Sequence, residues 1–317
     1  MKITNKDSEN SKHLISQISM LISAISMGFV GIFVDLLSHF PIYTIVFLRG
    51  LFGTLFLTIF MFITKSFSRD FLSSIFKRHW KALILVGITN PLVIYFYFVN
   101  ISISSYAISA FLLYTNGIFL LIILYITKED RDIKRINVIS FILAIIGIIV
   151  IMRIWTGNLL VSSIIAGILS SIFLALLNFS KKVIYNKPVK FSNMQEVNEA
   201  NIDHFLAWWA TLTLTLFFFP FGISDLSNLN FIDLGVSILL GLIPTALAFT
   251  LFNIGVKRDK GGNIIILAYF EPVIATINTA IFRGEFSIYT IIGGLFILLA
   301  NILILKYSNG KRRSARL

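Results

Sequence analysis

The chain has no cysteine, few histidines and little charge. Its 317 residues include four His and six Pro, and Asp, Glu, Lys and Arg together make up 13%. The absence of cysteine excludes disulfides, thiolate catalysis and cysteine-ligated metals. The histidines are expected at or outside helix ends, so no buried histidine cluster is predicted to bind zinc or haem; they are His13, His39, His79 and His204. We therefore expect no cofactor and no catalytic metal. A phosphate loop of the G-x-x-x-x-G-K-[ST] type is also absent, which argues against ATP hydrolysis.

Long apolar runs make up most of the sequence. Hydrophobic residues make up 57% of the chain and form ten runs of roughly 20 residues, the length needed to cross a hydrocarbon core about 30 Å thick. The sequence predicts an all-α integral membrane protein with ten transmembrane helices. These are expected at Leu14–Asp35, Ile42–Ile63, Ala82–Asn100, Ala107–Ile126, Ile136–Met152, Leu159–Ser180, Phe205–Ile223, Leu234–Val256, Asn263–Ile281 and Ile288–Leu305.

Basic residues alternate between the loops. Of the 27 Lys and Arg, 24 fall in the N-terminus, in every second loop and in the C-terminal tail, residues 306–317. The other side receives only Arg153 and Arg283, and Arg49 lies inside a span. Because cytoplasmic loops carry the excess of basic residues, a multi-pass plasma-membrane protein with both termini in the cytoplasm is predicted. The basic tail is expected to attract lipid headgroups, and no nucleic acid partner is predicted.

The ten spans divide into two weakly similar halves, 14–152 and 153–305. The segment Gly87–Pro91 aligns with Gly241–Pro244, and setting Asn116 against Pro272 places Glu129 against Glu285. Two copies of five spans each must lie in opposite membrane orientations, which is the inverted-repeat arrangement of many secondary transporters. Coincidental similarity between apolar helices is the alternative interpretation.

Small-residue and charged motifs follow in a characteristic order along residues 14–305. They are Gly28 and Gly31, Arg49-Gly50, Thr245–Phe249, Glu271-Pro272-Val273, Gly284-Glu285 and Gly293-Gly294. This order resembles the EamA-type ten-helix members of the drug/metabolite transporter superfamily. The resemblance implies two EamA-type repeats and carriage of a small metabolite, such as an amino acid or a nucleotide-related compound, with the substrate left open. Asn116-Gly117 stands where that family usually has a proline, which predicts a fourth helix straighter than the ninth.

Two ionisable residues lie deep inside predicted spans. A charge near the bilayer centre costs at least about 2.5 kcal/mol, so it normally faces a cavity or a partner. Only Arg49 and Glu271 are in this position. Arg49 could form a structural salt bridge with Asp35 or Glu271. Alternatively, Glu271 lines a cavity and meets a cationic substrate group or takes a proton.

Neutral polar residues at similar depth are further candidates for a substrate cavity, namely Asn90, Tyr95, Tyr114, Asn116, Thr245 and Tyr269. Each could instead form an interhelical hydrogen bond. Three prolines are expected to interrupt helices, namely Pro91, Pro244 and Pro272. Interruptions at matching positions of two halves indicate a transporter site. The polar segment Lys181–Asp203 is interpreted as a linker between the halves.

These features predict a secondary transporter that moves a small-molecule substrate by alternating access among membrane lipids. A membrane-embedded enzyme or a sensor subunit is the alternative. An enzyme would need paired catalytic groups, whereas the sequence has a single carboxylate at mid-span, Glu271. A non-enzymatic function is therefore predicted. Direction of transport, proton coupling and a homodimer stay open.

Overall fold

The computed structural model describes residues 5–64, 66, 69–127, 135–156, 161–186, 199–257 and 265–314, and all regular structure within them is helical. Seven helical segments are long and apolar enough to cross a membrane, and three shorter apolar helices accompany them at Val138–Met152, Leu267–Phe282 and Ile288–Leu303. All ten predicted apolar segments are thus helical. The all-α membrane fold class is confirmed.

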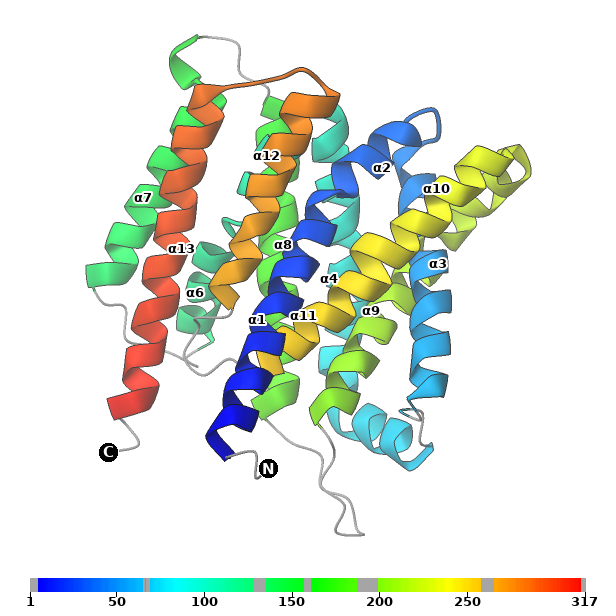
Figure 1. Ribbon diagram of the computed structural model, residues 1–317. Helices are drawn as coiled ribbons and strands as arrows, with labels where there is room; N and C mark the ends of the chain where they lie inside the picture. Colours follow the sequence, from blue (N-terminus) through cyan, green and yellow to red (C-terminus); the bar gives the residue numbers. More distant parts are fainter. Residues whose placement is uncertain are drawn as a thin grey trace.

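The segments run up and down a single bundle (Figure 1). The first five are formed by α1 (Asn5–Gly28) with α2 (Val30–Leu36), α3 (Ile42–Ile63), α4 (Arg69–Ile103), α5 (Tyr106–Leu113) with α6 (Asn116–Ile126), and α7 (Arg135–Met152). The last five are formed by α8 (Val161–Asn186), α9 (Glu199–Gly222), α10 (Phe231–Gly241) with α11 (Ala248–Lys257), α12 (Phe270–Phe282) and α13 (Ile288–Ser314). We call the end where α1 begins and α13 ends the lower end, and the opposite end, which carries α2, the upper end.

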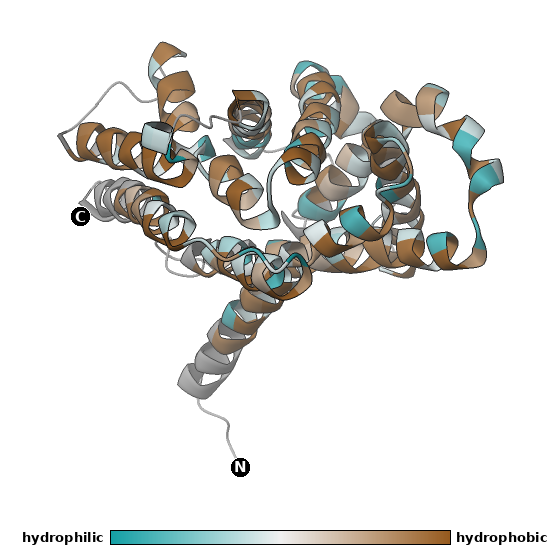
Figure 2. Ribbon diagram, turned by 90° about the horizontal axis from the view of Figure 1, so that it is seen from above, coloured by the Kyte–Doolittle hydropathy of each residue, from teal (hydrophilic) through white to brown (hydrophobic). Residues whose placement is uncertain are grey.

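Large apolar side chains cover the outside of the bundle as well as its centre. Phe98 and Phe205 are fully buried in the core, whereas Ile59, Phe62 and Leu295 are about half exposed or more on helix exteriors. Seen from above, hydrophobic residues predominate along the helices (Figure 2). A soluble protein would place polar residues on such faces; here they fit a lipid surround, in which each helix satisfies its own backbone hydrogen bonds.

Glycines permit very close helix packing at two places. A Cβ on Gly147 of α7 would lie 2.6 Å from the Gly293 carbonyl oxygen of α13, and a Cβ on Gly28 would lie 2.6 Å from Ile274 of α12. In lipid, such close backbone approach is a main source of helix association. The α7–α13 pair therefore packs tightly at one side of the bundle (Figure 1).

Helix breaks differ from the predicted positions. Pro91 lies within a continuous α4, whose backbone departs from helical geometry only at His79. The fourth segment, expected to be the straighter one, is broken at Tyr114 and Thr115, between α5 and α6. Pro244 does lie in an irregular stretch, the π-helical turn Leu242–Leu247. Pro272 lies in the first turn of α12, where its missing N–H needs no partner, after the 3-10 turn Ile265–Tyr269.

Several helix ends also differ from the predicted ends. α4 begins at Arg69, and α8 and α9 extend into the predicted linker, so that only residues 187–198, outside the described residues, separate them. α13 continues through Ser314, which makes most of the predicted tail helical. The histidine prediction was wrong in placement, since His79 and His204 lie inside α4 and α9 and His13 inside α1. Within the described residues, no group of three His, Asp or Glu is close enough to hold a metal ion.

Candidate functional site

A cavity of about 460 Å³ occupies the centre of the bundle. Arg49 of α3 and Glu271 of α12 line its deep part, and Lys181, Lys182 and Asp203 line it at the lower ends of α8 and α9. Leucine, valine and isoleucine side chains make up much of the remaining wall. The cavity therefore extends from the depth of the two buried charges toward the lower end.

Six of the eight predicted residues lie around this cavity, and they are Arg49, Asn90, Tyr114, Asn116, Tyr269 and Glu271. The structure places the other two elsewhere. Tyr95 stacks on Phe218 of α9, with ring centroids 5.5 Å apart. Thr245 does not line the cavity, but its hydroxyl oxygen contacts the guanidinium of Arg49. Thr245 therefore positions a cavity residue and Tyr95 contributes to packing.

Arg49 is 4% exposed and is held by the π-helical turn. Its Nε donates to Thr245 Oγ1 at 3.0 Å and its Nη2 to the Pro244 carbonyl oxygen at 3.2 Å. The Phe98 ring lies 5.4 Å from Cζ, at a distance suited to a cation–π contact. Nη1 is enclosed and has no hydrogen-bond partner among the described residues. Two of the three guanidinium nitrogens are thus engaged and the third is left over.

Glu271 is 6% exposed and faces the same cavity. The Tyr114 hydroxyl lies 2.9 Å from Glu271 Oε2 and 2.8 Å from the Ala268 carbonyl oxygen, and its single proton is donated to one of them at a time. Because Glu271 is in the first turn of α12, the helix dipole favours its negative charge. Three local features therefore stabilise a carboxylate at this depth: the Tyr114 hydroxyl, the helix terminus and the nearby Arg49.

No salt bridge joins Arg49 to Asp35 or Glu271 in the described part of the chain. Arg49 and Glu271 are near enough for their charges to attract each other, yet they are not in ion-pair contact. Asp35 is instead paired with Arg283. The structural salt bridge considered from the sequence is not formed, because Thr245 and Pro244 hold the guanidinium and Arg283 takes Asp35.

The backbone carbonyls at the helix breaks are hydrogen-bonded by side chains. Asn278 Nδ2 donates to the Gly28 carbonyl oxygen at 2.9 Å, where α1 ends. Asn301 Nδ2 donates to the Tyr114 carbonyl oxygen at 2.6 Å, and Asn116 Nδ2 to that of Leu113 at 3.0 Å, both at the break between α5 and α6. A buried carbonyl without a partner costs several kcal/mol in lipid. These side chains therefore allow irregular backbone beside the cavity.

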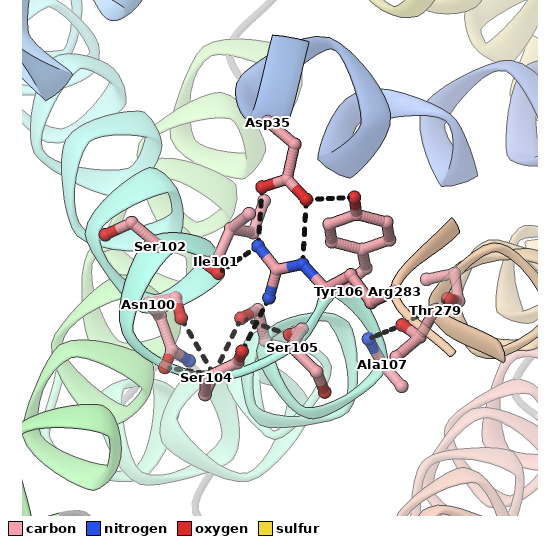
Figure 3. Close-up of polar contacts among 12 residues, drawn as sticks. Asp35, Asn100, Ile101, Ser102, Ser104, Ser105, Tyr106, Ala107, Thr279 and Arg283 are labelled. Atoms are coloured by element: carbon pink, nitrogen blue, oxygen red, sulfur yellow. Dashed lines mark hydrogen bonds and ion pairs between the residues drawn. The ribbon is translucent and has the colours of Figure 1, made fainter. Parts of the chain in front are cut away.

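An ion-pair cluster joins three elements above the cavity, and we call Asp35, Tyr106 and Arg283 the upper cluster (Figure 3). Arg283 contacts Asp35 with two nitrogens, Nε to Oδ2 at 2.8 Å and Nη2 to Oδ1 at 2.5 Å. Tyr106 donates its hydroxyl proton to Asp35 and offers its ring face to the guanidinium. The hydrogen bonds to Asp35 raise the pKa of Arg283 above its usual value.

Two further contacts fix Arg283 in the cluster. Its nitrogens donate to the carbonyl oxygens of Ser104 at 2.6 Å and Ile101 at 3.0 Å, which belong to the end of α4 and the turn after it. Gly284, with φ of 66°, ends α12 in the left-handed conformation that glycine adopts without strain. The guanidinium therefore bridges the ends of α2, α4 and α12.

Sequence reasoning missed the upper cluster and the lower mouth of the cavity. From the sequence, Arg283 is only one of two basic residues on the outer side, although Asp35 ends the first apolar run. The predicted linker includes Lys181, Lys182 and Asp203. The signal that could have placed these residues on helices is the helical spacing of the sixth and seventh apolar runs, which continues into them.

Comparison with known proteins defines the family. The model of the EamA-like transporter family matches residues 14–153 and 163–306. The chain belongs to this family. An uncharacterized transporter of Archaeoglobus fulgidus is 26% identical over 298 residues, covering 90% of this chain and 94% of that protein. A crystal structure with a TM-score of 0.59 and 13% identity covers 93% of this chain and 97% of the other, and at that identity the likeness shows the fold alone.

As a member of the EamA-like transporter family, the protein is a multi-pass membrane transporter. Each matched range contains five of the ten apolar segments. The two charges at the deep end of the cavity come one from each range, Arg49 from the first and Glu271 from the second. The residues of the upper cluster likewise come from both, since Asp35 and Tyr106 precede residue 153 and Arg283 follows residue 163.

Proposed function

We propose that the protein is a secondary transporter that moves a small metabolite across the plasma membrane by alternating access. One observation carries this proposal. The cavity holds two buried charges at its deep end and reaches the lower end, whereas the upper cluster joins the helices above it. A volume of about 460 Å³ is in the range of small-molecule sites. The structure then corresponds to a state open toward one side of the membrane.

The contacts above the cavity form successive levels along α12. Asn278 binds the Gly28 carbonyl, Thr279 Oγ1 accepts a hydrogen bond from the Ala107 amide at 3.0 Å, and Arg283 binds Asp35. Arg283 lies twelve positions beyond Glu271, or about 18 Å at a helical rise of ~1.5 Å per residue. A route from the charges to the upper end requires these levels to separate. Alternating access would open them and close the mouth between Lys181 and Asp203.

The arrangement of the halves and their orientation belong to the same proposal. We take 14–152 and 153–305 as inverted five-helix repeats, because an odd number of crossings reverses the second copy. Contacts between the repeats above the cavity, such as Arg283 with Asp35, are then expected to change during transport. The lower end is assigned to the cytoplasm because the excess of Lys and Arg is predicted there.

Glu271 is the residue on which transport is expected to depend most. Its carboxylate meets a cationic group of the cargo or takes a proton, and the two roles give different responses to a pH gradient. A Glu271→Gln variant keeps the shape and the contact with Tyr114 but removes the charge. We expect it to express normally and to lose most transport of a cationic or proton-coupled substrate.

The test is uptake and efflux of a labelled metabolite panel in proteoliposomes, with and without a pH gradient. Glu285→Gln is the matched control, because Glu285 is exposed beyond the end of α12 and has no polar side-chain contact in the described residues. Glu271→Gln protein that transports at the wild-type rate across the pH range would refute the role of this carboxylate. A chain that moves no member of the panel, in either direction, would count against the proposed function.

A further inference from the structure

The deep end of the cavity holds two opposite charges that are not paired with each other. Arg49 and Glu271 are 4% and 6% exposed, and each is held by neutral partners instead of by the other. Two opposite charges that attract each other in a medium of low dielectric would normally gain most by direct contact. Their separation needs a physical reason.

The hydrogen bonds of each residue explain how the separation is maintained. The π-helical turn draws Arg49 toward Thr245 and the Pro244 carbonyl, and Thr245 in turn donates its hydroxyl proton to the Leu240 carbonyl oxygen at 3.1 Å. Glu271 is drawn toward Tyr114 on the other side. The irregular backbone of α10–α11 and the break between α5 and α6 thus hold a cation and an anion apart across one cavity.

Both charged groups also keep unused hydrogen-bonding capacity. Arg49 Nη1 has no acceptor among the described residues, although an arginine nitrogen buried without a partner is costly. Glu271 has one hydrogen-bond partner in the described structure, a single hydroxyl at Oε2, whereas a carboxylate can accept several bonds. The guanidinium therefore has a donor left for an anionic oxygen, and the carboxylate has acceptor sites left for an ammonium group.

Resting on the proposed transport function, we propose that the cargo is a small zwitterion with an apolar body. Its carboxylate binds Arg49 and its ammonium group binds Glu271. The remaining wall, rich in leucine, valine and isoleucine with Phe249 and Phe252, accommodates an apolar side chain. At the mouth, the two positive charges of Lys181 and Lys182 outnumber the negative charge of Asp203, which favours entry of the carboxylate end. An apolar α-amino acid has this combination of groups.

Three matched probes separate the two charges. L-Leucine carries both, 3-methylbutylamine lacks the carboxylate and 4-methylpentanoate lacks the ammonium group. Binding to the purified full-length protein is measured by thermal stabilisation over a concentration series. We expect leucine to bind at least about tenfold more tightly than either analogue, because each lost charged hydrogen bond is worth on the order of tenfold or more. Valine and methionine are tested in the same way, each beside the amine that lacks its carboxylate and the acid that lacks its ammonium group. They cover the case in which the leucine side chain does not fit the cavity.

Two variants then give crossed results that a structural role does not. Arg49→Gln should lower leucine affinity to that of 3-methylbutylamine while leaving the amine unaffected. Glu271→Gln should lower leucine affinity to that of 4-methylpentanoate while leaving the acid unaffected. Matched controls are Arg153→Gln and Glu285→Gln, since Arg153 contacts Ser287 and the Tyr289 ring and lies outside the cavity lining.

Each result decides the proposal. The expected order of affinities with the crossed loss supports it. No binding by any of the three amino acids, or equal binding of amine and amino acid in the wild type, overturns it, even if both variants fail to fold. Equal loss of all probes in both folded variants overturns it too. Transport of only non-zwitterionic compounds in proteoliposomes would refute this inference and leave the transporter function standing. Leucine binding without any transport would refute the transporter function and leave the zwitterion site standing.

Discussion

Neutralising Asp35 should open the upper end of the cavity. Asn in place of Asp35 keeps the size of the side chain but removes the charge that faces Arg283 through two contacts. Removing one partner of a fully buried pair costs about 3–5 kcal/mol, and of an exposed pair about 0–1. The side chains of Arg283 and Asp35 are 16% and 34% exposed, which places this pair between the two cases. Because Ser104 and Ile101 still bind the guanidinium, we expect a loss of roughly 1–2 kcal/mol.

This loss falls on one state only, if the pair forms only when the upper end is closed. A change of roughly 1–2 kcal/mol alters the ratio of two states by a factor of about 5–30. The chain has no cysteine, so Met27→Cys provides a single thiol in the cavity wall. In intact cells, its rate of labelling by a membrane-impermeant thiol reagent should rise by about that factor with Asp35→Asn.

Glu285→Gln is the matched control for Asp35→Asn. Glu285→Gln removes a negative charge two residues from Arg283 without breaking a contact in the described structure, and should leave labelling unchanged. Thermal stability in detergent shows whether each variant is folded. An unchanged labelling rate in folded Asp35→Asn protein, or the same rise in Glu285→Gln, would refute the assignment of the upper cluster as the closing contact.

Three further variants test other parts of the structure. Gly31→Ala should disfavour the closed upper end, because a Cβ there would lie 2.3 Å from Cγ of the buried Tyr106 ring; faster external labelling of Met27→Cys would show it. Gly293→Val should lower detergent thermal stability by several degrees, since a Cβ at 2.5 Å from the Gly147 carbonyl oxygen forces α7 and α13 apart, and an unchanged melting temperature would contradict this packing. Cysteine in place of Asn228 should be labelled only from outside, and labelling only from inside would reverse the assigned orientation.

The fold class was predictable because a helix that crosses the bilayer needs an apolar run as long as the hydrocarbon core is thick. Each of the ten runs is helical, since lipid leaves the backbone no other way to satisfy its hydrogen bonds along a single segment. The positions of the breaks were not predictable. Pro91 removes a hydrogen bond without ending α4, whereas Tyr114 and Thr115 interrupt the fourth segment with no proline present. Whether a helix tolerates a break depends on which distant side chain reaches its carbonyls, and no local pattern encodes that.

The candidate site was predictable where the cost of burial is large. Glu271 and Arg49 stood out because charges in mid-span are expensive, and both line the cavity. Asp35 and Arg283 did not stand out, because charges at the ends of apolar runs are ordinary. Their contact joins residues 248 positions apart, and only the packing of α2 against α12 brings them together. A pairing that depends on tertiary packing cannot be read from one sequence.

The two kinds of contact around the cavity differ in how readily water can replace them, and this difference bears on which parts move. Carbonyls at the breaks are bound at depth by Asn278, Asn301 and Arg49, where losing the partner costs several kcal/mol. The upper cluster and the mouth residues lie near the ends of the bundle, where water can take over from a lost partner at small cost. Asn301 and Tyr114 line the cavity instead of lying above it, so we expect their contact to stay bound through the proposed cycle. The contact between Asn278 and Gly28 lies between the buried charges and the upper cluster along α12, so we expect it to break when the upper end opens.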